Sequence, residues 1–102
     1  MARVVVTRLA DEDVAEILSN IAREAGYNVA AKYLALVEGL YAKIADYPEG
    51  FQTRPKLGPH IRVGIVYPYL VIYRHDTGAD TASIVRVVDG RRRLTRKLLR
   101  EK

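Results

Sequence analysis

The hydrophobic positions in the first half of the chain recur with the spacing of amphipathic helices. A β-branched run at residues 3–7 predicts a strand before them. Two apolar stripes at three- and four-residue spacing then predict two helices, with Gly26 ending the first and Asn28 capping the second. The stripes are Leu9, Ala10, Val14, Ile17, Leu18, Ile21, Ala22 and Ala25, followed by Ala30, Tyr33, Leu34, Val37, Leu40, Tyr41 and Ile44. Because the turn between them is short, the two helices are expected to form an antiparallel hairpin.

The second half of the chain has the pattern of strands. Proline and glycine residues between positions 47 and 59 predict a loop. Three runs rich in β-branched and aromatic residues follow, at 60–66, 69–75 and 81–88, and they predict three consecutive strands separated by turns. The predicted order is β-α-α-β-β-β, an α+β fold in which an N-terminal helical hairpin packs on one face of an antiparallel sheet.

Length and composition are those of one small globular domain. The chain has 102 residues, of which 49% are hydrophobic, so it has enough apolar surface to form a core. It contains no cysteine, which excludes disulfides, thiolate chemistry and zinc fingers. No apolar run approaches the ~20 residues that span a bilayer, and the first residues lack the apolar core of a signal peptide. We therefore expect a cytoplasmic protein that does not contact a membrane.

Positive charge is concentrated at the C-terminal end. Lys and Arg total 17 and Asp and Glu total 12, but residues 91–102 contain seven basic residues and one acidic residue. That segment carries +6, while residues 1–90, which we expect to form the single domain, carry −1. The segment suits a polyanion or an acidic protein partner, although a solvated tail that aids solubility is an equal alternative. Leu94, Leu98 and Leu99 give it an apolar edge with which it is expected to dock on the domain as a helix.

Three arginines lie at matching places in the predicted strands. Arg62, Arg74 and Arg86 each follow an apolar residue, and alternate side chains of a strand point to one face. The pattern predicts an exposed basic surface on the sheet face away from the helices, continuous with the C-terminal segment. The alternative is that these arginines only solvate an open sheet face.

No group of residues has the spacing of a catalytic or metal site. His60 and His75 are both predicted to lie on the surface, and the acidic residues 11–13 are explained as charges at a helix start. Neither the Walker nor the Rossmann glycine pattern occurs. We predict no catalytic residues, no metal site and no cofactor.

Three patterns, read in order, resemble the ParE/RelE superfamily of bacterial type II toxins. The first is the strand 4–7 leading into a helix that begins with Ala10 and Asp13. The second, at 68–74, is Pro-Tyr-Leu-Val-Ile-Tyr-Arg, which is similar to the hairpin strand of the ParE branch. The third, at 84–92, is Ile-Val-Arg-Val-Val-Asp-Gly-Arg-Arg, which is similar to the superfamily's C-terminal strand.

The resemblance implies a toxin with one of two activities. RelE-like members cleave ribosome-bound mRNA with an arginine at the position of Leu70, and the superfamily usually has a histidine at the position of Asp89. Both departures favour the ParE branch, whose members inhibit DNA gyrase by trapping it with cleaved DNA and perform no chemistry of their own. The alternatives are a ribosome-dependent mRNA endonuclease with other catalytic residues, and an inert binding module derived from a toxin.

The ParE interpretation also implies partners and contact residues. The expected partners are a ParD-like antitoxin in a hetero-oligomer, DNA gyrase, and gyrase-bound DNA. The antitoxin is expected to cover an apolar groove between the sheet and the helical hairpin. The candidate target-binding residues are Arg62, Arg86, Arg91, Arg92 and Arg93.

Overall fold

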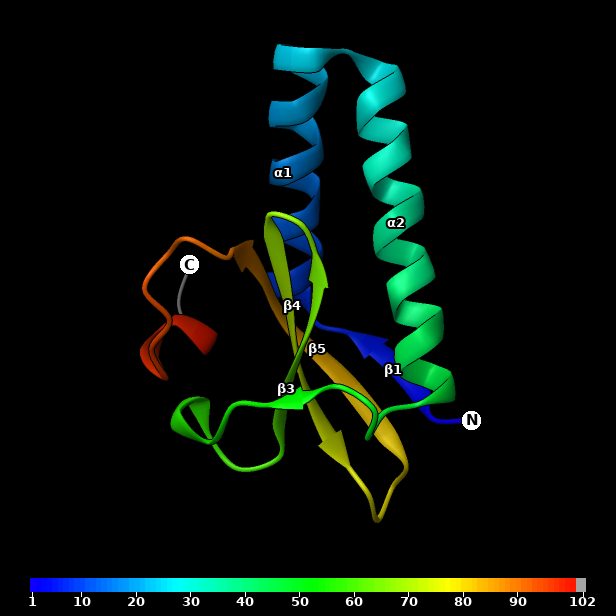
Figure 1. Cartoon of the computed structure of the whole chain (residues 1–102), viewed down its shortest axis with the longest axis vertical. Coiled ribbons are helices and arrows are strands. Elements are labelled where there is room, and N and C mark those ends of the chain that lie inside the picture. Colours follow the sequence, from blue (N-terminus) through cyan, green and yellow to red (C-terminus); the bar gives the residue numbers. More distant parts are fainter. Residues whose placement is uncertain (101–102) are drawn as a thin grey trace.

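A five-stranded sheet forms one layer of the fold and two antiparallel helices form the other (Figure 1). The computed structural model describes residues 1–100. Its elements are β1 (Arg3–Val6), α1 (Arg8–Ala25), α2 (Tyr27–Asp46), β2 (Gln52–Thr53), η1 (Pro55–Leu57), β3 (Ile61–Val66), β4 (Tyr69–Asp76), β5 (Thr81–Asp89) and η2 (Lys97–Leu99). The predicted α+β fold with an N-terminal helical hairpin is confirmed.

The strand order is β1-β5-β4-β3-β2. The strands β3, β4 and β5 pair antiparallel to one another, as predicted, and β2 pairs antiparallel to β3, whereas β1 pairs in parallel with β5, with Arg3 opposite Thr81. The sheet is therefore mixed. The prediction missed β2, which lies inside the expected loop, because two polar residues give no periodic signal.

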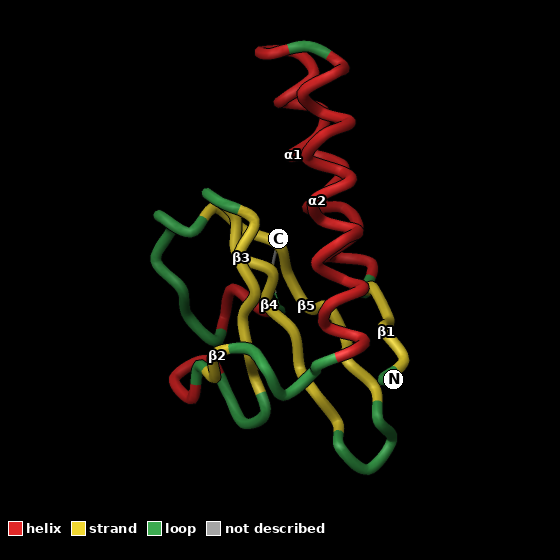
Figure 2. Tube along the Cα trace, turned by 45° about the vertical axis from the view of Figure 1, so that its right-hand side comes forward, coloured by secondary structure: helices red, strands yellow, loops and turns green. Residues whose placement is uncertain are grey.

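The helical hairpin projects well beyond the sheet (Figures 1 and 2). Thr7 caps α1, since its Oγ1 accepts a hydrogen bond from the Ala10 amide. Gly26, at φ 95°, ends α1 as predicted, because this backbone conformation favours glycine. The prediction that Asn28 caps α2 is wrong: Gly26 is the N-cap residue, and Asn28 lies inside α2.

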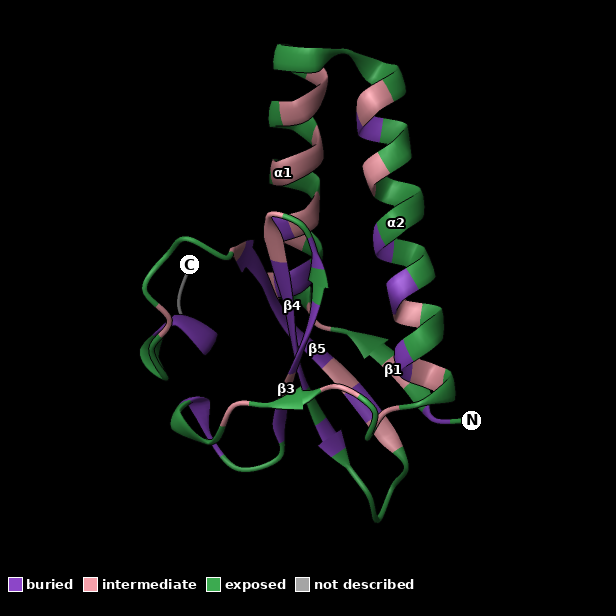
Figure 3. Ribbon diagram, viewed as in Figure 1, coloured by how far each residue is buried: buried purple, intermediate pink, exposed green. Residues whose placement is uncertain are grey.

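The central strands β4 and β5 are mostly buried (Figure 3), and apolar side chains pack on both faces of the sheet. The near core, between the sheet and the helices, contains Ala10, Val37, Leu40, Ile44, Val66, Val71, Tyr73, Ala82, Ile84 and Val87. The far core, on the opposite face, contains Leu57, Ile61, Val63, Leu70, Ile72, Val85, Val88, Leu98 and Leu99. The predicted docking of the C-terminal segment is confirmed, but η2 is a single 3-10 turn and not an α-helix.

Candidate functional site

A basic arm, residues 91–100, leaves the end of β5 and returns across the far core. Arg91, Arg92, Arg93, Arg96, Lys97 and Arg100 are all exposed on it. The last two residues of the predicted segment 91–102 lie outside the described part of the chain. Leu98 and Leu99 of the arm are buried in the far core, so the apolar side of the arm faces the sheet and its cationic side chains are exposed to solvent.

The arm begins with an ion pair between neighbours in sequence. Arg91 Nε donates to Asp89 Oδ1 at 2.9 Å, and Arg91 Nη2 donates to Asp89 Oδ2 at 2.6 Å. This hydrogen bonding with Arg91 lowers the pKa of Asp89 to about 2. Asp89 therefore partly neutralises Arg91, and it leaves Arg92 and Arg93 as the more available cations at this end of the arm.

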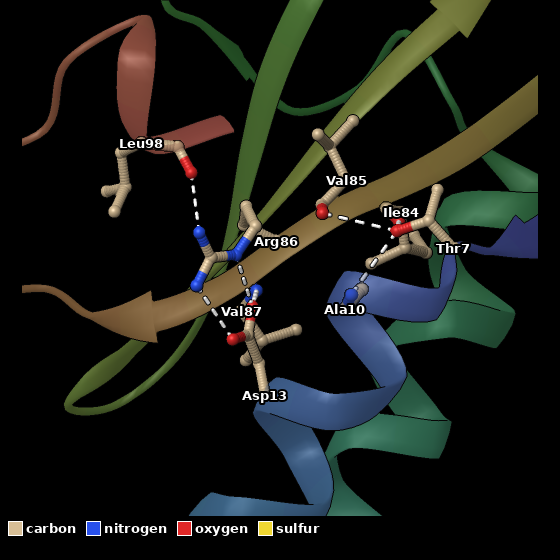
Figure 4. A network of polar contacts seen from close by, with 8 residues as sticks. All are labelled: Thr7, Ala10, Asp13, Ile84, Val85, Arg86, Val87 and Leu98. Atoms are coloured by element: carbon tan, nitrogen blue, oxygen red, sulfur yellow. Dashed lines mark hydrogen bonds and ion pairs between the residues drawn. The ribbon is translucent and has the colours of Figure 1, made fainter. Parts of the chain in front are cut away.

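A buried ion pair joins the arm to α1 (Figure 4). Arg86 is only 2% exposed and Asp13 only 7%. Arg86 Nε donates to Asp13 Oδ2 at 2.6 Å and Arg86 Nη2 donates to Asp13 Oδ1 at 2.8 Å, while Arg86 Nη1 donates to the Leu98 carbonyl at 2.5 Å. Hydrogen bonding with Asp13 raises the pKa of Arg86, so the guanidinium stays charged.

Two sequence interpretations are corrected by this pair. Arg86 was expected on an exposed surface, and it is buried. Asp13 was explained as a charge at a helix start, and it is a buried partner of β5. Its Oδ2 also accepts a hydrogen bond from the Val87 amide at 3.0 Å, at the edge of β5 that the short strand β1 leaves unpaired. Thr7 Oγ1 similarly donates to the Ile84 carbonyl at 2.7 Å, so side chains from the start of α1 continue the pairing of that edge.

The three strand arginines do not share one face of the sheet. Arg62 is paired with Tyr73, which belongs to the near core, whereas Arg86 is paired with Ile72 of the far core. Arg74 is exposed and is paired with Ile61 of the far core. The prediction of a common arginine face is therefore wrong. Arg62 Nη1 instead donates to the carbonyls of Glu49 and Phe51, which holds the loop before β2 against β3.

The two histidines differ from each other. His60 is exposed, as predicted, whereas the surface prediction for His75 is wrong because this side chain is 5% exposed. The imidazole of His75 lies between two carboxylates, with Nδ1 at 3.9 Å from Glu49 Oε1 and Nε2 at 3.5 Å from Asp80 Oδ1. The two carboxylates approach opposite ring nitrogens, and within residues 1–100 no cluster of three or more such side chains is placed to hold a metal ion.

An apolar groove of about 430 Å³ lies between α2 and β3. Leu36, Gly39 and Lys43 line its helical side, and Ile65 and Tyr67 line its strand side. Ile65 is 62% exposed and Tyr67 is 82% exposed, which is unusual for large apolar and aromatic side chains so close to one another. β2 pairs with β3 only at Arg62 and Val63, so the outer edge of β3 beyond them has no strand partner within residues 1–100.

Both features are suited to binding. The basic arm presents several guanidinium groups, and its backbone accepts a hydrogen bond from buried Arg86 next to two buried leucines. The groove offers apolar side chains next to an unpaired strand edge. Leu70, at the position where the RelE branch has an arginine, is buried in the far core and has no charge to offer a phosphate. Among the described residues, no helix is long and apolar enough to cross a membrane.

Comparison with known proteins agrees with this fold. A family model for the ParE toxin of the type II toxin–antitoxin system parDE matches residues 4–94. Toxin ParE3 of Caulobacter vibrioides is 31% identical over 98 residues, covering 96% of each chain. Two solved structures share the fold: the chromosomal ParDE system of P. aeruginosa (TM-score 0.62, 19% identity, 87% of this chain and 96% of that one) and the RelBE2 toxin–antitoxin complex of Mycobacterium tuberculosis (TM-score 0.59, 21% identity, 86% and 96%).

Proposed function

Because this chain belongs to the ParE family of toxins of type II toxin–antitoxin systems, we propose that it inhibits DNA gyrase by binding the enzyme with its DNA cleaved. A ParD-like antitoxin forms a complex with the toxin and neutralises it. The observation that carries the proposal is the exposed basic arm packed on the far core, in a protein whose family match favours the ParE branch over the RelE branch.

The basic arm is the proposed target-binding surface. Cleaved DNA on a topoisomerase presents phosphates beside acidic protein, and guanidinium groups form charge-assisted hydrogen bonds with both. Arg91, Arg92 and Arg93 are exposed and are assigned this contact, with gyrase and gyrase-bound DNA as the acceptors. Arg62 is half-buried and holds a loop with one of its nitrogens, so its contribution is secondary. Arg86 supports the arm from inside and does not itself reach the target.

The groove between α2 and β3 is the proposed antitoxin site. An amphipathic segment of the antitoxin would bury the exposed side chains of Ile65 and Tyr67, and an extended stretch would add to the free edge of β3. Lys43 at the rim favours an acidic segment. Leu98 and Leu99 of the basic arm pack on the opposite face of the sheet, whereas the start of the arm adjoins the turn beside the groove, where the Gly90 amide donates to the Pro68 carbonyl at 2.7 Å.

The test is a paired assay on the protein purified free of antitoxin. One half measures gyrase supercoiling and the accumulation of cleaved gyrase–DNA complexes, and the other half measures mRNA cleavage on translating ribosomes. We expect trapped gyrase complexes and intact mRNA. Cleaved mRNA with unaffected gyrase would overturn the proposal and support the endonuclease alternative.

A triple variant tests the assigned contact. Replacing Arg91, Arg92 and Arg93 with alanine should weaken gyrase inhibition by about a hundredfold or more, because each charge-assisted hydrogen bond is worth roughly 1.5–3 kcal/mol. The matched control replaces three other exposed arginines, Arg3, Arg8 and Arg23, which changes the net charge equally. If the two triple variants lose the same activity, net charge and not the arm is responsible.

A further inference from the structure

We propose that Asp13 and Arg86 are positioning residues for target binding: their buried ion pair fixes the orientation in which the basic arm presents its arginines. The inference rests on the proposed function, since it assigns the arm to the target. Neither residue touches the target itself. Each acts through the carbonyl group of Leu98, which the pair holds.

The geometry requires an arginine at position 86. One edge of the guanidinium, formed by Nε and Nη2, donates to both carboxylate oxygens of Asp13 at 2.6 and 2.8 Å. The remaining nitrogen, Nη1, donates to the Leu98 carbonyl at 2.5 Å. A planar fork reaches these two acceptors at once, whereas the ammonium group of lysine is a single point of charge.

The Leu98 carbonyl, which accepts from Arg86, lies in η2, the turn that sets the orientation of the arm. Within η2 the Leu98 amide donates to the Thr95 carbonyl at 3.1 Å and the Leu99 amide donates to the Arg96 carbonyl at 3.2 Å. Leu98 and Leu99 anchor the same turn in the far core. Apolar contacts alone allow a turn to rotate or slide on the sheet. The hydrogen bond from Arg86 is directional and selects one orientation.

The buried position of the pair supports a geometric role. Removing an arginine and an aspartate from water has a large desolvation cost, and a well-packed apolar pair is often equally or more stabilising. An apolar pair, however, could not form the hydrogen bonds that connect α1, β5 and the arm. Since Asp13 lies in α1 and also accepts from the Val87 amide, the orientation of the arm depends on how α1 sits against β5.

The experiment compares Arg86→Lys and Asp13→Asn with the wild type in three measurements. These are gyrase inhibition, affinity for the antitoxin, and amide hydrogen exchange at Leu98, Leu99 and Arg100 relative to the core strand β4. Arg8→Lys is the matched control, because Arg8 forms an exposed ion pair with Glu12 on the same helix.

For Arg86→Lys we expect exchange at the three arm amides to become at least about tenfold faster, while exchange in β4 changes much less. Gyrase inhibition should weaken by about tenfold or more, antitoxin affinity should stay within about twofold, and Asp13→Asn should show the same pattern more weakly. Arg8→Lys should change none of these quantities.

Three results would overturn the inference. The first is unchanged exchange at the arm amides, and the second is faster arm exchange with full gyrase inhibition. The third is an equal rise of exchange in the arm and in β4 with a parallel loss of antitoxin affinity, since this shows a general loss of stability. A wild type that does not inhibit gyrase overturns the proposed function instead, and the exchange data still show whether the pair holds the arm.

Discussion

Tyr73 is a single buried side chain whose contribution to stability depends on pH. It is fully buried in the near core, and its hydroxyl donates to the Pro48 carbonyl at 2.5 Å, which ties β4 to the segment after α2. Burial raises the pKa of Tyr73 to about 12, because the phenolate would lose its hydration. In the unfolded chain the same hydroxyl titrates near pH 10.

This difference predicts a loss of stability in alkali. Since the folded-state pKa is raised, the contribution of Tyr73 is complete below pH 10 and is lost as the pH rises toward about 12. Tyr73→Phe should lower the free energy of unfolding by about 1 kcal/mol at pH 7, through the lost hydrogen bond, and should make stability fall less steeply between pH 10 and 12. Urea unfolding across this range measures both effects.

Tyr67→Phe serves as the control, because Tyr67 is exposed and its hydroxyl is hydrated in both states. Burial also raises the pKa of Tyr41 to about 12. Tyr41 remains in both variants, so stability should still fall somewhat with pH in this range. If the free energy of unfolding of Tyr73→Phe falls between pH 10 and 12 as steeply as that of the wild type, the loss of stability in alkali does not come from Tyr73.

At the same scale, the sequence predicted which arginines of the arm are exposed but not the pair that supports it. Strand alternation placed Arg86 on an open face, yet the pairing of β5 with β4 shifts at this point: Arg86 is opposite Ile72 while Ile84 is opposite Tyr73. One residue, Val85, is therefore extra, and the alternation breaks. Asp13 gave no separate signal, because an acidic residue early in a helix already has a sufficient explanation.

At the scale of elements, the contact between α2 and β3 depends on a glycine. A Cβ atom on Gly64 would lie 3.0 Å from both methyl carbons of Leu40, which is closer than normal packing allows. The absence of a side chain at position 64 thus lets the helix lie directly on the strand beside the groove. Gly39, one residue earlier on α2 than Leu40, has open space where its Cβ would be.

The two glycines give opposite predictions for the same substitution. Gly64→Ala should destabilise the protein by about 1–3 kcal/mol, because the extra methyl forces α2 and β3 apart. Gly39→Ala should stabilise it by about 0.5–1 kcal/mol, since alanine is the better helix former and meets no neighbour. Chemical denaturation measures both values, and equal effects of the two substitutions would contradict this account of the contact.

The elements themselves were largely predictable. The helices were recognised by long apolar stripes and the three later strands by β-branched runs bounded by turns, so their bounds agree closely with the structure. The parallel pairing of β1 with β5 was not predictable, because strand patterns carry no information on which strands become neighbours. The groove was expected from the family resemblance, and its lining residues required the structure.

At the scale of the whole molecule, the two proposed binding surfaces approach each other at one end. There the Gly90 amide, next to the start of the arm, donates to the carbonyl of Pro68, the residue after Tyr67 of the groove, at 2.7 Å. The groove is formed by α2 and β3, and the basic arm packs over the far core. Leu36 and Lys43, on the helical side of the groove, belong to α2, which packs on the near core, so an antitoxin bound to that side does not need to cover the arginines of the arm. The two interactions should respond independently to substitutions, provided that these preserve the fold.

We predict that a substitution in the groove weakens antitoxin binding alone and that the substitutions in the arm weaken gyrase inhibition alone. Leu36→Asp should weaken antitoxin binding by at least about tenfold, because Leu36 is exposed on the helical side of the groove and the change places a charge there, and should leave gyrase inhibition intact. The alanine triple at Arg91, Arg92 and Arg93 should do the reverse. Calorimetric titration with antitoxin and the supercoiling assay measure the two activities.

Val5→Asp is the control for the groove variant, since Val5 is also a partly exposed apolar residue but lies on β1 at the other edge of the sheet. A joint loss of both activities in the Leu36 variant, with the fold intact, would show that the two surfaces are coupled.

The parallel pairing of β1 with β5 also bears on how the protein is made. A ribosome synthesises β1 and the helical hairpin long before it reaches β5, the strand that pairs with β1. The ion pair of Asp13 likewise cannot form until Arg86, 73 residues further along, has been synthesised. Folds dominated by such distant contacts form slowly, since the chain must close large loops before any contact stabilises them. The nascent toxin consequently has no finished sheet, and no support for its arm, until nearly the whole domain has been translated.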